Sequence, residues 1–309
     1  LVACAEMLCG GITCCNDMYF YPEASAGVFE EAGLRAMIGL PVLDFPTPYA
    51  ADAEGCLRAG LAARDRYRHS RRLAFSLAPH APYTVGDESF ARIVTYAREL
   101  DLPIQTHLQE TRPELEQALD ASGETPLARL DRLGVTGPGF VAVHVVHPGP
   151  GDVERLAAQG CHVVHCPASN MKLASGVAPV ASYLAAGVNV ALGSDGAASN
   201  NRLDLFAEMR LASLIAKVAS GDATALPAAA VLRMATLGGA VALGLEATIG
   251  TLEPGKDADV VAVDFGALEL RPCYDPVSHL VHAAGREHVS DVWIEGERVV
   301  ERSAPLRLD

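Results

Sequence analysis

PIQTHLQET, residues Pro103–Thr111, is the stretch around which the rest of the chain is organised. Its apolar part predicts a strand over 104–108, with His107 at the strand's end and Glu110 three residues later. A strand end is where an α/β fold presents functional side chains. An imidazole beside a carboxylate suits metal-assisted hydrolysis, in which one group is a ligand and the other moves a proton. Taken alone, such a stretch more often marks a loop with a structural His and a solvated Glu.

Apolar runs of this kind alternate with amphipathic segments along most of the chain. Strands are expected at 12–18, 34–42, 73–78, 104–108, 140–144, 161–166 and 188–193, and helices at 1–10, 22–32, 52–69, 87–100, 113–133 (broken near Gly123), 152–159 (capped by Asp152), 180–186, 203–220 and 227–243. Continuous apolar strands indicate a parallel sheet that is buried on both faces. Seven βα units before residue 245 favour an α/β fold of the (β/α)8 TIM-barrel type. A doubly wound sheet is the alternative, but no GxGxxG follows any of these strands.

The pattern changes after residue 245. Residues 250–264 contain a turn at Glu253-Pro254-Gly255 and then a β-rich run, and Asp291–Val300 reads as a hairpin around Glu295-Gly296. We therefore expect a barrel over residues 1–249 and a small C-terminal β domain over residues 250–309. The small domain shows no obvious chemistry.

Composition excludes several classes of partner. The chain has 309 residues, half of them hydrophobic and 20% charged, with a formal net charge of −14. That charge argues against nucleic acid and against an anionic membrane surface, and no apolar run approaches the roughly 20 residues of a membrane span. The eight cysteines are scattered, mostly inside apolar runs, which indicates buried thiols in a reducing, cytoplasmic compartment rather than a disulfide framework.

Polar side chains collect at the ends of successive predicted strands. These are His80, His107 with Glu110, His144, His165 and Asp195. In a barrel such ends converge on one mouth, where barrel enzymes place catalysis. Histidine with carboxylate and no thiolate fits a catalytic divalent metal that keeps an open coordination position.

Several linked motifs in this order resemble the amidohydrolase superfamily. They are APHAPYTV (78–85), THLQET (106–111), HCPASNMKLASG (165–176), ALGSDGAASNN (191–201) and GTLEPGKDADVVAVD (250–264). NDMYF (16–20) and the segment 274–300 narrow the resemblance to the group of methylthioadenosine/S-adenosylhomocysteine deaminases and chlorohydrolases. The resemblance covers essentially the whole chain.

This resemblance implies a metal-dependent hydrolytic deamination of an adenine-type nucleoside, with release of ammonia. It assigns His107 and Asp195 as metal ligands and Glu110 as the proton shuttle at the substrate ring. His144 is expected beside the attacking water, Asp195 accepts the water's proton, and His80 contacts the substrate. The expected cofactor is one divalent metal, Zn²⁺ first, with Fe²⁺ or another divalent ion as alternatives.

The chain departs from the family pattern at its first barrel strand. Members of the family carry His-x-His there, but this sequence contains no His-x-His. The chain is therefore expected to be a fragment that lacks the first strand, with two further His ligands in the absent part. Because two ligands rarely hold a catalytic ion, we expect these residues alone to bind metal weakly and to turn over little.

Other residues are expected to be structural or are left open. His147 is expected in a loop, His162 and His165 in structural roles, and His279, His282 and His288 away from the site. For Asn170, Ser194 and Asn200, a hydrogen bond near the site and a loop-capping role are equally good. Surface roles suffice for Arg58, Arg64 and Arg66, so no arginine is assigned to the substrate.

Three classes of function remain open. The first is an aminohydrolase of an adenine-type nucleoside. The second is a chlorohydrolase or a deaminase of another amino-heterocycle, such as a triazine or guanine. The third is an inactive fragment that only binds or assembles. A homo-oligomer is expected from the family resemblance.

Overall fold

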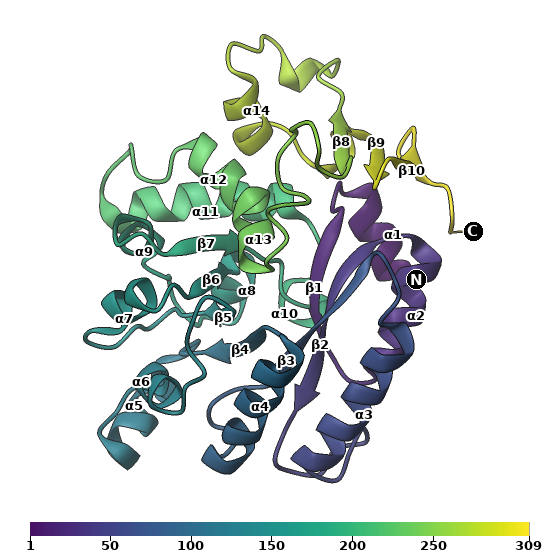
Figure 1. Cartoon of the computed structure of the whole chain (residues 1–309). Helices are drawn as coiled ribbons and strands as arrows, with labels where there is room; N and C mark the ends of the chain where they lie inside the picture. The colour runs from purple at the N-terminus through teal and green to yellow at the C-terminus, as the bar shows by residue number, and fades with distance from the viewer. Residues whose placement is uncertain (309) are drawn as a thin grey trace.

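Seven strands form one parallel sheet in chain order in the computed structural model, which describes residues 1–308 (Figure 1). They are β1 (Cys14–Met18), β2 (Arg35–Val42), β3 (Leu73–Pro79), β4 (Ile104–Leu108), β5 (Phe140–His144), β6 (His162–His165) and β7 (Asn189–Leu192). All seven predicted strands are confirmed, and their ends differ from the prediction by at most two residues. The sheet curls like a barrel that is left open between its edge strands β1 and β7.

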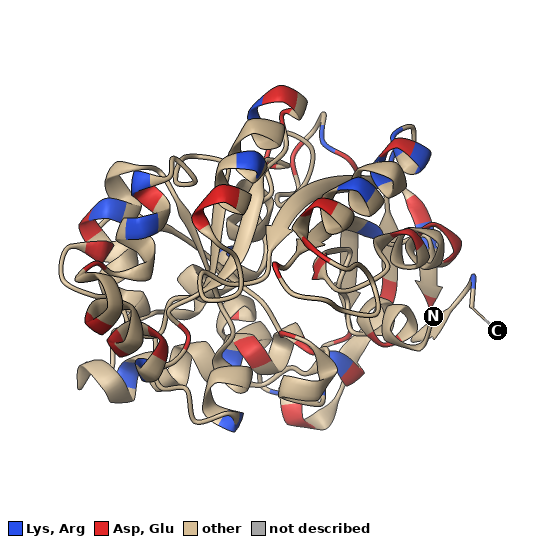
Figure 2. Ribbon diagram, turned by 90° about the horizontal axis from the view of Figure 1, so that it is seen from below, with Lys and Arg blue, Asp and Glu red and all other residues tan. Residues whose placement is uncertain are grey.

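Helices follow the strands and cover the sheet from outside (Figures 1 and 2). They are α1 (Val2–Cys9), α2 (Pro22–Ala32), α3 (Ala53–Tyr67), α4 (Asp87–Leu100), α5 (Arg112–Ser122), α6 (Pro126–Arg132), α7 (Asp152–Ala158), α8 (Pro167–Lys172), α9 (Val180–Ala185), α10 (Ala197–Asn200), α11 (Leu205–Ser220), α12 (Ala228–Ala235), α13 (Leu237–Ala242) and α14 (Pro276–His282), with short 3₁₀ turns at Leu268–Leu270 and Arg286–His288. The segments α8, α10 and α14 had no predicted helix.

Two helix predictions were wrong in detail. The expected helix 227–243 is divided at Thr236, where the backbone has φ −123° and ψ −95°. The following helix turns onto β7, and Gly238 approaches so closely that a Cβ there would lie 2.6 Å from the Val190 carbonyl. Asp152 does not cap α7, because Gly151 is the N-cap. Its carboxylate instead accepts hydrogen bonds from the Gly149 amide and from Gln109.

A polar layer crosses the inside of the sheet below the strand ends. Gln105 on β4 is buried, and its Nε2 donates to Ser76 Oγ on β3 and to the Asp17 carbonyl on β1, both at 3.1 Å. Asn16 donates to the Gln105 amide oxygen. Gln105 can reach past β2 because residue 39 is glycine: a Cβ there would lie 2.6 Å from the Asp17 carbonyl and closer still to Gln105. Side chains therefore fill the interior, as in a closed barrel.

A second, four-stranded antiparallel sheet lies near the start of β1 and β2 and contains β8 (Val260–Val263), β9 (Val289–Ile294), β10 (Glu297–Glu301) and β11 (Ala304–Pro305). The predicted hairpin is confirmed: β9 and β10 pair across a turn in which Glu295 has φ 55° and Gly296 φ 77°. Arg35 at the start of β2 ties the two sheets together, with Asp257 at 2.9 Å and Asp259 at 3.2 Å. The domain boundary at residue 249 stays a prediction.

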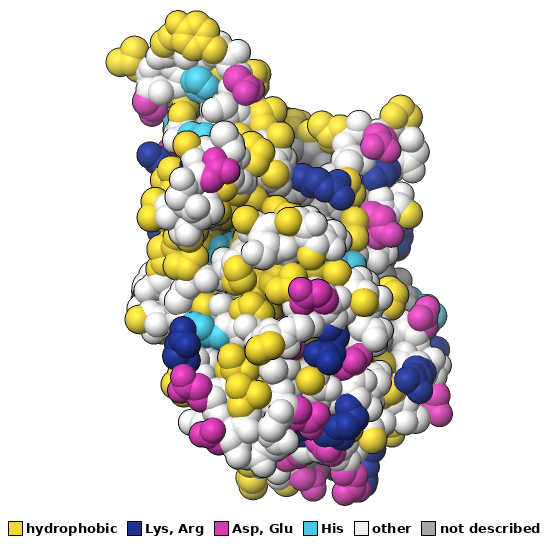
Figure 3. Space-filling model, turned by 90° about the vertical axis from the view of Figure 1, so that its left-hand side faces the viewer, with side chains coloured by type: hydrophobic (Ala, Val, Ile, Leu, Met, Phe, Trp, Pro, Cys, Tyr) yellow, Lys and Arg dark blue, Asp and Glu magenta, His cyan; other side chains and the backbone are white. Residues whose placement is uncertain are grey.

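The surface agrees with the composition. Most charged residues lie on the outer helices and loops (Figure 2). On the face drawn in Figure 3, apolar side chains are denser over the upper part and charged ones toward the lower end. All eight cysteines are free, and only Cys273 is exposed, which confirms that they form no disulfide framework. Among residues 1–308, no helix has both the length and the apolar character that a membrane crossing requires.

Candidate active site

Three imidazoles lie side by side across the ends of β3, β4 and β5. The rings of His80 and His107 are 5.1 Å apart between centroids and meet edge to face. The rings of His107 and His144 are 5.6 Å apart and nearly parallel. The parallel register explains this row, because β4 and β5 pair Leu108 with His144 and so bring their last residues to one level. Three of the predicted site residues are thus brought together.

His107 is held in the tautomer that a metal ligand needs. Its Nδ1 lies 2.8 Å from the carbonyl oxygen of His80, so this nitrogen carries the hydrogen and donates it. The Nε2 lone pair is therefore free. A backbone carbonyl that fixes one ring nitrogen in this way is the usual support of a metal-binding histidine. The geometry supports the ligand role predicted for His107.

Glu110 and His144 face each other. His144 Nε2 lies 3.8 Å from Glu110 Oε2, and Asn170 Nδ2 donates to His144 Nδ1 at 3.0 Å. This leaves the ring hydrogen of His144 on Nε2, directed at the Glu110 carboxylate. Glu110 Oε1 accepts a second hydrogen bond from Ser175 Oγ at 3.2 Å. A carboxylate beside an imidazole is an arrangement that can hold and pass on a proton.

The turn that carries Glu110 is clamped by Glu114. The two carboxylate oxygens of Glu114 accept from the backbone amides of Gln109 at 2.8 Å and of Glu110 at 2.9 Å. Gln109 has φ 48°, a left-handed conformation that costs a non-glycine residue energy. Its side chain is buried and bridges the carbonyl of His147 and the carboxylate of Asp152, at 2.8 and 2.9 Å. The loops after β4 and β5 are thereby locked together.

Asp195 follows β7 in another left-handed conformation, with φ 59°. Its Oδ2 accepts from Ser169 Oγ and its Oδ1 accepts from the Gly196 amide, both at 2.6 Å. Asp195 is close enough for its charge to raise the pKa of His144, although burial outweighs this effect and the pKa of His144 is lowered overall. Asp195 therefore lies close enough to the imidazole row to act on it through its charge.

The histidines at the strand ends are kept neutral. Burial, helped by the neighbouring His107, lowers the pKa of His80 to about 4. Burial, helped by His144, lowers the pKa of His165 to about 4 as well. A neutral imidazole accepts hydrogen bonds and binds metals, which an imidazolium does not. His165 is 2% exposed, and its Nδ1 has no hydrogen-bond partner among the described residues.

The donor set fits a divalent metal in kind. His107 offers a neutral nitrogen and Asp195 a carboxylate, the ligand types of catalytic zinc and related ions. Residues 1–308 contain no group of three or more His, Cys, Asp or Glu side chains arranged to hold an ion. The structure thus provides two candidate ligands, one on β4 and one after β7, which is the pair that the sequence predicts.

The residues expected to be structural have structural partners. His147 Nε2 bonds the Ser175 carbonyl at 2.6 Å, and His162 Nε2 bonds the Pro138 carbonyl at 2.9 Å. Arg64 and Arg66 lie on α3 and pair with Asp65 and Glu23. Of the residues left open, Asn170 reaches the site through His144, and Asn200 Nδ2 bonds the Ser194 carbonyl at 2.7 Å.

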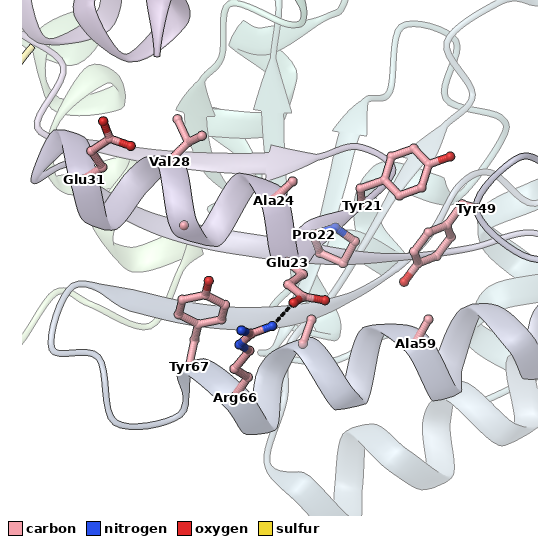
Figure 4. A pocket seen from close by; sticks show the side chains of 12 residues that line it. Tyr21, Pro22, Glu23, Ala24, Val28, Glu31, Tyr49, Ala59, Arg66 and Tyr67 are labelled. Atoms are coloured by element: carbon pink, nitrogen blue, oxygen red, sulfur yellow. Dashed lines mark hydrogen bonds and ion pairs between the residues drawn. The ribbon is translucent and has the colours of Figure 1, made fainter. Parts of the chain in front are cut away.

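A groove of about 650 Å³ runs between α2 and α3 on the outside of the sheet (Figure 4). Tyr21, Tyr49 and Tyr67 line it together with the ion pair of Arg66 and Glu23. Its lining includes no histidine and none of the predicted site residues. We therefore place the chemistry at the strand ends and not in this groove.

Four supporting residues were missed from the sequence: Glu114, Ser169, Ser175 and Glu208. A signal existed for Glu114, because Thr111-x-x-Glu114 is a capping-box pattern and Thr111 does cap α5. Glu208 lies in the middle of α11 and is 1% exposed. Burial raises its pKa to about 7. Nothing in its local sequence distinguishes it from the other residues of an amphipathic helix.

Known proteins match this chain over nearly its whole length. The model of the amidohydrolase family matches residues 1–299. The 5-methylthioadenosine/S-adenosylhomocysteine deaminase of Teredinibacter turnerae is 47% identical over 300 residues, which cover 97% of this chain and 68% of that protein.

Two solved structures superpose on the whole of this chain. A zinc-bound adenosine deaminase from Xanthomonas campestris superposes with a TM-score of 0.97 at 44% identity, over 100% of this chain and 70% of that one. The zinc complex of an atrazine chlorohydrolase from Arthrobacter aurescens superposes with a TM-score of 0.92 at 25% identity, over 100% of this chain and 73% of that one.

Proposed function

The chain belongs to the amidohydrolase family and is a hydrolase of carbon–nitrogen bonds, and we propose that it deaminates 5-methylthioadenosine and S-adenosylhomocysteine. The observation that carries the proposal is the facing pair of Glu110 and His144, at 3.8 Å, beside His107. Hydrolytic removal of an aromatic amine needs a group that protonates the ring and a group that handles the proton of water. Relatives named for this activity are 40–47% identical to the chain.

The side chains divide the work as follows. Glu110 donates a proton to the ring nitrogen beside the carbon that bears the amine, so the addition of water leaves no free anion. His144 orients the water, and Asp195 takes up its proton. Asp195 then passes that proton to the amine, which leaves as ammonia, and the hydroxyl on the ring returns a proton to Glu110 as it becomes the carbonyl. His80, whose ring lies next to His107, contacts the substrate.

One divalent ion completes this proposal. Members of the family depend on a metal, and a related solved structure carries zinc. When bound, such an ion acts as a Lewis acid that lowers the pKa of water toward neutrality. His107 and Asp195 would hold it. Catalytic zinc sites have at least three protein ligands, so we propose two further histidines from outside the described residues.

Ammonia release from a substrate panel tests the assignment. The protein that includes the two further histidines, purified with added zinc, should release ammonia from both nucleosides, and its Glu110→Gln variant should not. Zinc is compared with Fe²⁺ in parallel, because the donor set admits either. No ammonia from either nucleoside with any metal would overturn the proposal and favour an inactive fragment.

A second candidate is suggested by the superposition on an atrazine chlorohydrolase at 25% identity. The same panel should therefore contain a chlorotriazine and guanine. Release of chloride, or of ammonia from guanine but not from the nucleosides, would assign the chain to that second class. The higher identity to the nucleoside deaminases makes the nucleosides the first substrates to test. Cytoplasmic location and a homo-oligomeric state stay predictions.

A further inference from the structure

We propose that Glu208 is a positioning residue that holds Asp195 through a closed ring of hydrogen bonds. The inference rests on the proposed function, because it assumes that Asp195 acts in the reaction. Glu208 touches neither the imidazole row nor Asp195. Its effect would pass through two loops that end on either side of Asp195.

The first half of the ring runs through the loop after β6. Glu208 Oε2 accepts a hydrogen bond from the backbone amide of Ala168 at 3.0 Å. The next residue, Ser169, is buried and donates its hydroxyl to Asp195 Oδ2 at 2.6 Å. The position of the Asp195 carboxylate thus depends on the position of the Ser169 backbone, which Glu208 fixes.

The second half runs through the loop after β7. Glu208 Oε1 accepts from Asn200 Nδ2 at 2.7 Å. The other hydrogen of the same Nδ2 is donated to the carbonyl of Ser194, also at 2.7 Å. Ser194 directly precedes Asp195, so the ring closes. Each non-covalent link is a hydrogen bond of ordinary length.

A buried carboxylate at this place needs a reason, because burying it is costly. Glu208 is 1% exposed, and burial together with the nearby acids Asp204 and Asp195 raises its pKa. An apolar side chain of the same size would pack there without that cost, but it would leave the Ala168 amide without this acceptor. What the carboxylate adds is two acceptors, one for each loop.

The conformation of Asp195 shows what the ring has to hold. With φ 59°, Asp195 sits in a region that non-glycine residues leave unless the surroundings over-determine them. Ser169 restrains its side chain, and Asn200 restrains the peptide before it. Glu208 joins these two restraints, so its loss should loosen both at once.

The test compares Glu208→Gln, Ser169→Ala and the double variant in the purified protein. Glutamine keeps the size of the side chain but offers only one acceptor, so one arm of the ring is lost. Each variant is assayed for kcat and KM on the nucleosides, for zinc affinity by competition with a chelator, and for thermal stability. Asn200 is only half-buried, so Asn200→Ala removes the second arm and replaces Glu208→Gln as the test if that variant does not fold.

We expect Glu208→Gln to lower kcat and zinc affinity about tenfold each while KM changes less than twofold. The double variant should lose no more than the worse single variant, because both changes break one ring. Asp259→Asn is the matched control: it alters a buried carboxylate at the other end of the sheet, so it should lower stability with kcat and zinc affinity unchanged.

Two results would overturn the inference. One is a Glu208→Gln variant that loses stability like the control and keeps both kcat and zinc affinity. The other is a double variant in which the losses multiply, since this means that Glu208 and Ser169 act independently. Failure of the proposed function would show differently, as a wild-type protein that releases no ammonia. The zinc affinities, which need no substrate, would then still decide the role of Glu208.

Discussion

The two ends of the seven-stranded sheet bury charge in opposite ways. At the start of β2, Arg35 is 6% exposed and is matched by Asp257 and Asp259, the latter bound through two oxygens. At the opposite ends of the strands, Glu110 and Asp195 have no Lys or Arg partner among the residues that the structure describes. Their neighbours there are neutral imidazoles and hydroxyl groups.

Strained backbone accompanies the unmatched charge at the carboxyl ends of the strands. Gln109 (φ 48°) directly follows β4, His144 (φ 76°) ends β5, and Asp195 (φ 59°) lies three residues after β7. The residues of β2 that hold the small sheet are in ordinary extended conformation. The matched end is thus built for stability, whereas the other end keeps strained backbone and unmatched charge, which are typical of functional sites.

Removing the carboxylate of Glu110 should have the largest effect of the changes that test this contrast. Glu110→Gln should lower kcat about 10²–10⁴-fold, because the ring nitrogen loses its proton donor. Zinc content and melting temperature should stay close to wild type, since Glu110 is half-buried and pairs with no cation. Ammonia release, metal analysis and thermal unfolding measure the three quantities. A variant that keeps a tenth of its turnover would show that Glu110 is not the proton donor.

Removing Arg35, the cation at the start of β2, should lower stability and leave turnover unchanged, the opposite of the result expected for Glu110→Gln. Arg35→Met leaves two acids without their buried partner and should cost about 3–5 kcal/mol of unfolding free energy, with turnover per folded molecule unchanged. Urea denaturation measures the loss. The control is Arg66→Met, which removes the exposed pair with Glu23 and should cost less than about 1 kcal/mol. Equal losses in the two variants would refute the contrast.

Acid should weaken the fold through the imidazoles. The pKa of His165 is about 4 in the folded protein and close to 6.5 when unfolded. Between these values the unfolded chain binds more protons, so stability is full above pH 6.5 and falls as pH drops toward 4. The loss at pH 4 is roughly 3 kcal/mol for this residue. His165→Asn should flatten the dependence of unfolding free energy on pH, and an unchanged slope would contradict the assignment.

Filling the space at Gly39 should have the smallest effect. Gly39→Ala places a Cβ against the Asp17 carbonyl and the Gln105 amide, and such overpacking costs about 1–3 kcal/mol. Gly239→Ala is the matched control, because a Cβ at that helical position meets no atom within 4 Å. The control should be neutral or slightly stabilising. Thermal unfolding measures both variants. Equal stability of the two would show that the polar layer inside the sheet has room for a methyl group at residue 39.

Much of this arrangement could be predicted because it is local in sequence. His107 and Glu110 lie three residues apart at the end of a continuous apolar strand. The apolar run locates the strand, and the motif THLQET locates the two residues. The division at Thr236 could not be predicted in the same way. Neither glycine nor proline occupies that position, and the helix breaks because Gly238 must fit against the carbonyl of Val190.

The supporting residues were missed for a related reason. Glu208 meets Ala168 across 40 residues, and Ser169 meets Asp195 across 26. Each of these side chains lies in a segment whose own pattern is ordinary. Only folding brings them together, so their role can be read from the contacts and not from spacing.

The hairpin turn at Glu295-Gly296 has a practical consequence for anyone who labels this protein. Hairpin tips are favoured places to insert a tag or to open a permuted terminus. This tip is tethered, because the Glu295 amide donates to Asp259 at 2.8 Å and Arg72 binds both the Glu295 carboxylate and the Ile294 carbonyl. An insertion there would break these contacts between the small sheet and the barrel. The fully exposed loop at residues 221–224, after α11, is the better site for a reporter.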